Sequence, residues 1–226
     1  MTNEPIPDRQ DADALDDMAT RVPEPPEPFD PEEFILAAGK PLYRVFSNTR
    51  TVTEFNPSGA PASQRFSFFG DPQVPVLYAA ATDEAAVCET LLHNIPEAGG
   101  YLPPAGFRNK VMALARPNRD LRLARFMGTG LRKLKVETRQ LTDTPSSQYE
   151  HTNRWAEAAH AAGFDGIVWM ARKCNTDEAY VLFGDRVHAT DLASDPSFAR
   201  IFLRGQGFDW LVDFCTPLHV EVLTDL

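Results

Sequence analysis

The stretch that decides the fold is residues 42–95, LYRVFSNTRTVTEFNPSGAPASQRFSFFGDPQVPVLYAAATDEAAVCETLLHNI. It begins with an apolar run that carries Arg44, with Leu42 and Phe46 on the same strand face. A second run, VPVLYAA, alternates so that Tyr78 shares a face with Val76. The pattern predicts two strands, and a strand fixes the direction of such side chains closely.

The segment after the second strand is predicted to be a helix. Thr82 or Asp83 can cap its first turn. Its apolar residues follow the three-four spacing of one buried stripe: Ala85, Cys88, Leu92 and Ile95. Glu89 borders this stripe, so its carboxylate is expected to face the domain interior and to have a partner or a task.

Two arginines, a phenol and a carboxylate within one stretch suit an anionic, sugar-containing substrate. Arg44 lies in the first strand and Arg65 precedes an aromatic turn. A guanidinium pairs bidentately with phosphate, and it keeps its charge when it is partly buried. Taken singly, each of these residues is more often structural than chemical, so the functional interpretation depends on their clustering and on a resemblance.

The pattern resembles the RES-domain family, whose known members are bacterial toxins that degrade NAD or transfer its ADP-ribose. The family has an early strand arginine, an arginine opening an RW or RF segment, a strand ending in tyrosine, and a helix with a glutamate. Here these features match Arg44, Arg65 in RFSFFGDP, Tyr78 in VLYAA and Glu89 in AAVCETLLH. A second similar block spans residues 152–186, so the likeness covers about residues 40–190.

The resemblance implies an α+β, ADP-ribosyltransferase-like fold in which NAD is a substrate and no cofactor is needed. It implies catalytic roles for Glu89, Arg44 and Tyr78 in cleaving the bond between nicotinamide and ribose. The residues expected to bind NAD are Arg44, Arg65, Phe66, Tyr78, Arg172 and Asn175. The acceptor is left open among water, inorganic phosphate and a protein side chain. The family also implies an Xre-type helix-turn-helix antitoxin as a partner.

One position departs from the family pattern. The family serine normally precedes an arginine in the second block, whereas here Ala171 precedes Arg172. A hydroxyl that would help to hold the substrate is missing, and Asn175 and Thr176 are the nearest polar substitutes. The alternative is therefore a catalytically weakened protein of the same fold that binds a nucleotide or a partner.

The composition indicates one medium-sized domain preceded by an acidic leader. The chain has 226 residues, of which 43% are hydrophobic, and a formal charge of −10. Residues 1–30 contain nine acidic residues and two arginines, which gives 2 − 9 = −7, and they are rich in proline. Such a segment is expected to be mobile, either as a solubilising tail or as a contact for a partner or the site. The domain is expected over residues 31–226, with a short helix from a cap at Asp30 to Ala38.

Other patterns limit the functional classes. No run of about 18 apolar residues is present, which predicts no membrane contact and a cytoplasmic location. The three cysteines and five histidines show no metal-ligand spacing, so no metal is expected. Residues 108–139 contain ten basic and two acidic residues, a balance of 10 − 2 = +8. They match no recognition motif, so a solvated or partner-facing surface is favoured over direct nucleic acid binding.

The remaining elements complete a mixed fold. Strands are expected from residue 110 and at 167–171, 179–183 and 187–192, with helices at 147–162 and 197–203. The order is not a regular alternation, and no GxGxxG motif follows a strand, which excludes a doubly wound nucleotide fold. The sequence predicts short strands in one or two curved sheets, flanked by helices and long loops.

Overall fold

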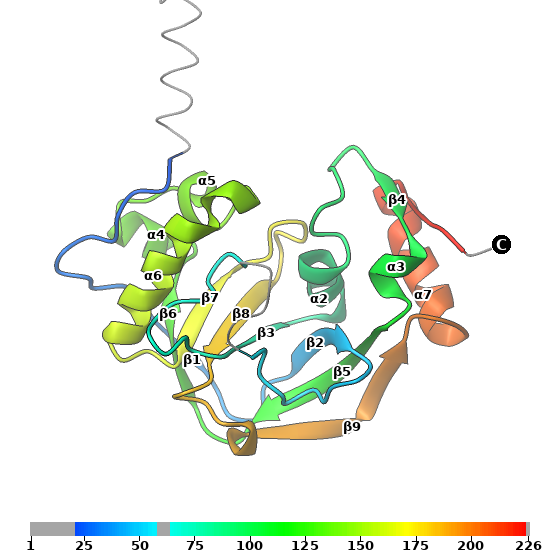
Figure 1. Cartoon of the computed structure of the whole chain (residues 1–226), viewed down its shortest axis with the longest axis horizontal. Helices are drawn as coiled ribbons and strands as arrows, with labels where there is room; N and C mark the ends of the chain where they lie inside the picture. Colours follow the sequence, from blue (N-terminus) through cyan, green and yellow to red (C-terminus); the bar gives the residue numbers. More distant parts are fainter. Residues whose placement is uncertain (1–20, 58–63, 225–226) are drawn as a thin grey trace, which may run out of the picture.

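The computed structural model describes residues 21–57 and 64–224, which form a curled sheet with helices packed against it. Figure 1 shows α2 over the middle of the sheet, α4 to α6 over one end, and α3 and α7 over the other. The sheet order is β1-β6-β7-β8-β3-β2-β5-β9, and only β6 and β7 are parallel neighbours. Its strands are β1 (Glu33–Leu36), β2 (Leu42–Ser47), β3 (Val76–Ala80), β5 (Lys110–Pro117), β6 (Leu121–Arg125), β7 (Gly166–Met170), β8 (Glu178–Phe183) and β9 (Leu192–Ile201).

Six α-helices and a second, small sheet complete the described part of the chain. The small sheet pairs β4 (Gly100–Leu102) in parallel with β10 (Val220–Val222). The α-helices are α2 (Asp83–Thr90), α3 (Pro104–Phe107), α4 (Thr129–Lys133), α5 (Thr138–Leu141), α6 (Tyr149–Ala161) and α7 (Gln206–Cys215). Three 3-10 turns lie at Ser146–Gln148 (η1), Ala189–Asp191 (η2) and Thr216–Leu218 (η3).

The elements that the sequence predicted most directly are confirmed. The apolar runs around Arg44 and Tyr78 are β2 and β3, and Thr82 caps α2 by accepting from the N–H of Ala85 at 3.2 Å. The mixed fold with a curved sheet, flanking helices and long connections is also confirmed.

Three local expectations were wrong, each because strand pairing or a tight turn prevailed over the local pattern. The helix expected from Asp30 to Ala38 is replaced by β1, which pairs antiparallel with β6. The helix expected at 197–203 is instead the end of β9, which pairs with β5. Half of the strand expected at 187–192 is the η2 turn, and only its last residue begins β9. Backbone pairing at a sheet edge can override the weak helix propensity of such short segments.

The end of the acidic leader packs on the domain, whereas residues 1–20 lie outside the described residues. Val22 is buried, and Trp155 of α6 donates from Nε1 to the carbonyl of Pro23 at 2.7 Å. The ring of Phe29 lies edge-on to Trp155 and to Phe126. These contacts make residues 22–29 part of the fold, although the sequence analysis assigned them to a mobile leader.

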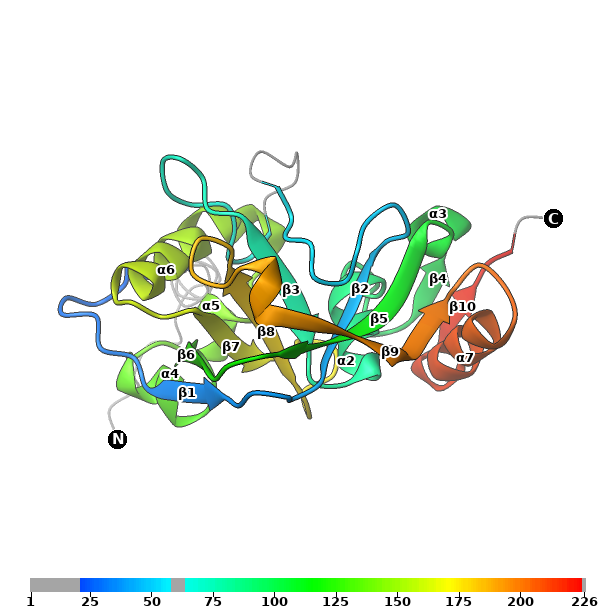
Figure 2. The same ribbon diagram turned by 90° about the horizontal axis from the view of Figure 1, so that it is seen from below.

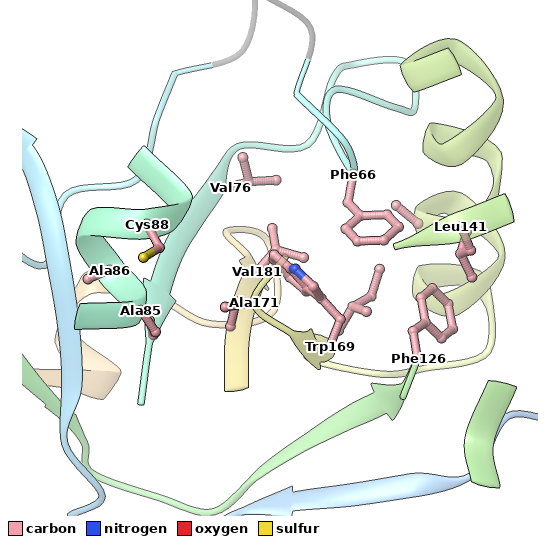
Figure 3. Packing of buried hydrophobic residues seen from close by; sticks show 14 of the residues in the cluster. Phe66, Val76, Ala85, Ala86, Cys88, Phe126, Leu141, Trp169, Ala171 and Val181 are labelled. Atoms are coloured by element: carbon pink, nitrogen blue, oxygen red, sulfur yellow. The ribbon is translucent and has the colours of Figure 1, made fainter. Parts of the chain in front are cut away.

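Two apolar clusters stabilise the two faces of the sheet. The larger lies between the sheet and the helices and includes Trp155 of α6. Figure 3 shows part of this cluster, with Trp169 and Phe126 among its members. The smaller lies on the opposite face and includes Leu77 and Leu182. A sheet buried on both faces supplies rigid strands on which functional side chains can be positioned.

The sheet opens between β2 and β3. Their ladder contains one registered pair, Tyr43 with Ala80. Farther along, Val76 of β3 forms a bridge with Asn56 of the following loop instead of with β2. Figure 2 shows the two strands from below, with the loop after β2 rising beside them. The separation of these strands leaves room for a cavity in the middle of the sheet.

Candidate functional site

A cavity of about 510 Å³ lies at the opening between β2 and β3, a size typical of small-molecule sites. It brings together the four residues that the sequence singled out first: Arg44, Arg65, Tyr78 and Glu89. It also contains polar and aromatic side chains that the sequence analysis did not assign to the site: Arg50, Asn56, His93, Lys110, Tyr149 and Trp169.

Glu89 is the acidic group of this cavity. It lies near the end of α2, and 15% of its side chain is exposed. Its Oε1 accepts from the backbone N–H of Arg172 at 2.6 Å, and its Oε2 lies 3.8 Å from Nη1 of Arg65. Burial raises the pKa of Glu89 above its ordinary value, while Arg65 and the N–H of Arg172 oppose that shift. The expected inward direction of this carboxylate is therefore correct.

Arg65 connects the aromatic turn to the cavity. Its side chain is 3% exposed, and its Nη2 donates to the carbonyl of Thr144 at 3.4 Å. Its guanidinium also lies over the ring of Tyr149, 5.6 Å from the centroid. Its Nε is buried and has no hydrogen-bond partner within the described residues. Arg65 thus places a guanidinium at the cavity beside Glu89, which fits an anion-binding role.

Tyr78 lies on the Val76 face of β3, as predicted, and its hydroxyl binds the aromatic turn. This hydroxyl donates to Oγ of Ser67 at 3.1 Å and accepts from the N–H of Phe66 at 3.3 Å. Burial raises the pKa of Tyr78 above its ordinary value. The phenol therefore remains neutral and fixes the turn that carries Arg65, while its ring lines the cavity.

Arg44 lines the cavity, but its guanidinium donates to the loop after β2. Nη1 donates to the carbonyls of Val52 at 2.9 Å and Glu54 at 2.6 Å, and it lies 3.4 Å from the carbonyl of Thr51. Nη2 donates to Oδ1 of Asn56 at 3.1 Å. The side chain is buried, and burial lowers its pKa to about 10, which still leaves it charged at neutral pH. These four acceptors make Arg44 a support of one cavity wall.

The other three predicted binding residues lie outside this cavity. Phe66 is fully buried in the core, where its ring lies edge-on to Phe126 and Trp169 (Figure 3). The guanidinium of Arg172 forms an ion pair with Asp143, so its backbone rather than its side chain contacts Glu89. Asn175 is exposed in the loop between β7 and β8. These positions indicate structural roles for Phe66 and Arg172, and no contact links Asn175 to the cavity.

Ala171, which stands where the family has a serine, is fully buried and does not line the cavity. Its N–H donates to the carbonyl of Asp177 at 2.9 Å. Its methyl group belongs to the core cluster drawn in Figure 3.

The sequence analysis missed a histidine–tyrosine pair at the cavity. Nε2 of His93 lies 2.8 Å from the hydroxyl of Tyr149. Burial lowers the pKa of His93 to about 4, and the neighbouring cations Arg65 and Arg172 act in the same direction. His93 is therefore neutral at pH 7. α2 ends at Thr90, so His93 lies in the turn after the helix, and helical periodicity does not mark it in the sequence.

The cavity is electropositive apart from Glu89. Arg50 donates to the carbonyl of Phe55 at 2.5 Å and to Asn56 Oδ1 at 2.9 Å, and Lys110 lies at the end of β5 that borders β2. A buried carboxylate among several cations suits a ligand that carries negative charge at one part and develops positive charge at another.

Neither a metal-binding cluster nor a membrane-spanning helix is present in the described residues. They contain no cluster of three or more histidine, cysteine, aspartate or glutamate side chains arranged to hold a metal ion. No helix in residues 21–57 and 64–224 is sufficiently long and apolar to span a membrane.

Comparisons with known proteins agree with the resemblance. A family model described as the RES domain matches residues 41–201. Among solved structures, the crystal structure of the M. tuberculosis MbcT–MbcA toxin–antitoxin complex is similar, with a TM-score of 0.53 and 11% identity. That match covers 73% of this chain and 85% of the other, and at this identity it shows a shared fold. No curated protein sequence matches.

Proposed function

The chain belongs to the RES-domain family, and from that premise we propose that it is a toxin-like enzyme that cleaves the nicotinamide–ribose bond of NAD. The observation that carries this proposal is the buried Glu89 carboxylate, which the N–H of Arg172 holds inside an arginine-rich cavity. A doubly wound nucleotide fold is absent from the described residues, so NAD would be bound as a substrate in the opening of the sheet.

Glu89 would stabilise the charge that develops during cleavage. Nicotinamide leaves as a neutral base, so positive charge builds up on the ribose in the transition state, as in other glycosidic cleavages. A preorganised carboxylate at that ribose lowers the barrier without reorganisation of solvent. The hydrogen bond from Arg172 N fixes Oε1 of Glu89, and Oε2, which lies 3.8 Å from Nη1 of Arg65, would face the ribose.

Arg65 would bind the pyrophosphate, because its guanidinium lines the cavity beside Glu89. We assign Arg44 and Tyr78 to positioning. Arg44 holds the wall formed by residues 51–56, and Tyr78 holds the turn before β3. The sequence analysis expected Arg44 and Tyr78 to act on the substrate directly. We assign them positioning roles because the polar atoms of both side chains already bind protein groups.

The acceptor of the ADP-ribose group is water, inorganic phosphate or a protein side chain. Lys110 and Arg50 at the cavity could attract phosphate, and the electropositive lining is equally compatible with a second anionic reactant. MbcT was crystallised with an antitoxin, MbcA. By analogy, we propose an Xre-type helix-turn-helix antitoxin as the partner that keeps this protein inactive.

A second candidate function is nucleotide or partner binding without turnover. The replacement of the family serine by Ala171 motivates it, although Ala171 is fully buried and does not line the cavity. Such a protein would bind NAD in the same cavity and release no nicotinamide.

The deciding experiment measures nicotinamide release from NAD by chromatography, with and without inorganic phosphate. We expect release by the unchanged protein and a loss of at least about a hundredfold in Glu89→Gln, which removes the charge but keeps the shape. Glu157→Gln is the matched control, because Glu157 is an exposed residue of α6. Folded, partner-free protein that binds NAD without releasing nicotinamide would establish the second candidate instead.

A further inference from the structure

A second cavity, of about 310 Å³, lies on the other side of α2. It is bounded by α2 and the segment after it on one side, and by residues 217–220 on the other. We call it the C-terminal pocket. The family match ends at residue 201, so the chain that closes this pocket lies outside the matched domain. Figure 1 shows that α7 and β4 lie together at this end of the molecule.

The C-terminal pocket is separate from the NAD cavity. Ala86, Thr90 and His93 line the NAD cavity, whereas Cys88 and Leu92 line the C-terminal pocket. With 3.6 residues per turn, Ala86 and Thr90 lie on the opposite face of α2 from Cys88, and Leu92 and His93 lie in the turn that follows the helix. An occupant of one cavity would therefore not overlap an occupant of the other.

The lining of the C-terminal pocket is amphipathic. Apolar groups form most of it: Leu92, Ile95, Pro96, Pro217, Leu218 and Val220. The polar part consists of two cationic side chains, Arg172 and Lys173, with His219 and the carboxylate of Glu97. This combination of an apolar body and localised positive charge suits a ligand with the complementary arrangement.

Lys173 is the pocket cation with the weaker ion pair. Its side chain is only 13% exposed, yet its Nζ lies 3.7 Å from Oε1 of Glu97, which is too long for a hydrogen bond. Glu97 is 78% exposed, so it is a weak, hydrated counterion. The guanidinium of Arg172 differs because it is paired with Asp143. A ligand carboxylate at the Lys173 end would meet a cation on a side chain that is only 13% exposed, where charge pairing is stronger than at the open surface.

We propose that the C-terminal pocket binds a small amphipathic anion, a carboxylate on a short aliphatic or aromatic body. The apolar body packs between Leu92 and Leu218, and the carboxylate pairs with Lys173. Glu97 competes with the ligand for that ammonium group. Binding involves neither NAD nor Glu89, so this inference stands independently of the proposed function.

The test is isothermal titration calorimetry of the full chain with octanoate, with octanol as a neutral probe of the same length. We expect octanoate to bind with one site per chain and octanol to bind at least tenfold more weakly. Leu218→Glu, which places a negative charge in the pocket at a partly exposed position, should weaken octanoate binding at least tenfold. Lys173→Met should do the same, whereas Lys40→Met, at an exposed site, should have no effect.

Glu97→Gln provides a gain-of-affinity test, because it removes the competing carboxylate at an exposed position. We expect tighter octanoate binding by a few-fold. The inference is overturned if octanoate does not bind, if octanol binds as tightly, or if Leu218→Glu leaves octanoate affinity unchanged. Circular dichroism of each variant checks that the fold is retained. The result for Leu218→Glu remains decisive even if Lys173→Met does not fold.

Discussion

Replacing Arg44 by methionine tests whether this residue supports the cavity wall or only contacts substrate. The change keeps an unbranched apolar stem of similar length and removes the guanidinium. The buried group donates to the carbonyls of Val52 and Glu54 at 2.9 and 2.6 Å, and to Asn56 Oδ1 at 3.1 Å. Without it, these acceptors lose a charged donor in a region largely closed to water.

The expected loss of stability follows from those contacts. Leaving a buried acceptor without a donor costs about 1–3 kcal/mol, and two of the carbonyls are bonded at short distance. Burying the guanidinium costs desolvation free energy, as its lowered pKa indicates. The variant does not have this cost, which offsets part of the loss of stability. We expect Arg44→Met to lower the free energy of unfolding by about 3 kcal/mol. Arg44→Lys should recover only part of it, because an ammonium lacks the planar fork that reaches both groups of acceptors.

The assay is equilibrium unfolding in urea, analysed by the midpoint and the slope. Arg50→Met is the matched control from the same wall. Arg50 is more exposed, and its carboxylate partner Glu54 lies at the surface, so we expect a loss of only about 1 kcal/mol. An Arg44→Met protein as stable as the unchanged one, but devoid of nicotinamide release, would refute the supporting role and restore Arg44 as a substrate contact.

Three further perturbations test other parts of the structure. In Gly166→Ala the new Cβ would lie 2.1 Å from the carbonyl oxygen of Val181, so β7 and β8 must separate; we expect a loss of about 2–4 kcal/mol in urea unfolding. Trp155→Phe removes the hydrogen bond to the carbonyl of Pro23 at 2.7 Å, and limited proteolysis should then cut residues 21–29 faster by several-fold. The folded-state pKa of His93, about 4, lies below its ordinary value of 6.5, so the unfolded chain binds the extra proton between these values. Stability should therefore fall as the pH drops from about 6.5 to about 4, and the urea midpoint of His93→Gln should fall less over that window.

Each of these has its own control. Gly106→Ala should be nearly neutral, because its Cβ would meet only the movable Cδ1 of Leu102 at 3.0 Å. Equal cleavage of residues 21–29 in Trp155→Phe and the unchanged protein would mean that the segment is held by other contacts. Glu89 affects the pH dependence of stability in the opposite direction, because its raised pKa makes the folded state bind more protons than the unfolded state. The variant Glu89→Gln separates this effect from that of His93.

The sequence was most informative where a periodic pattern coincided with a cap or a buried face. Both central strands and α2 were predicted because apolar spacing and the Thr82 cap agreed with the tertiary structure. The sequence pattern gave wrong secondary structure at the sheet edges. The Asp30 cap signal favoured a helix, but β6 offered an unpaired edge to residues 33–36, and pairing with it prevailed.

The membership of the candidate site was more predictable than the roles within it. Residue type and order suggested Arg44 and Glu89, and both line the cavity. The acceptors of Arg44 could not be foreseen, because the loop that carries them has no regular pattern. Likewise, the pair of His93 with Tyr149 joins residues 56 positions apart, a contact that only the packing of α6 creates.

The contact between Glu89 and Arg172 has a consequence for the synthesis of this protein. The two residues lie 83 positions apart, and the strand beside β3 is β8, which is also translated late. A chain emerging from the ribosome presents Arg44, Arg65 and Glu89 long before it can pair β3 with β8, and such distant pairings form late in folding. The partly made polypeptide therefore has most of the charged groups of the cavity but no fixed carboxylate, so the cavity is complete only once the second half of the chain is made.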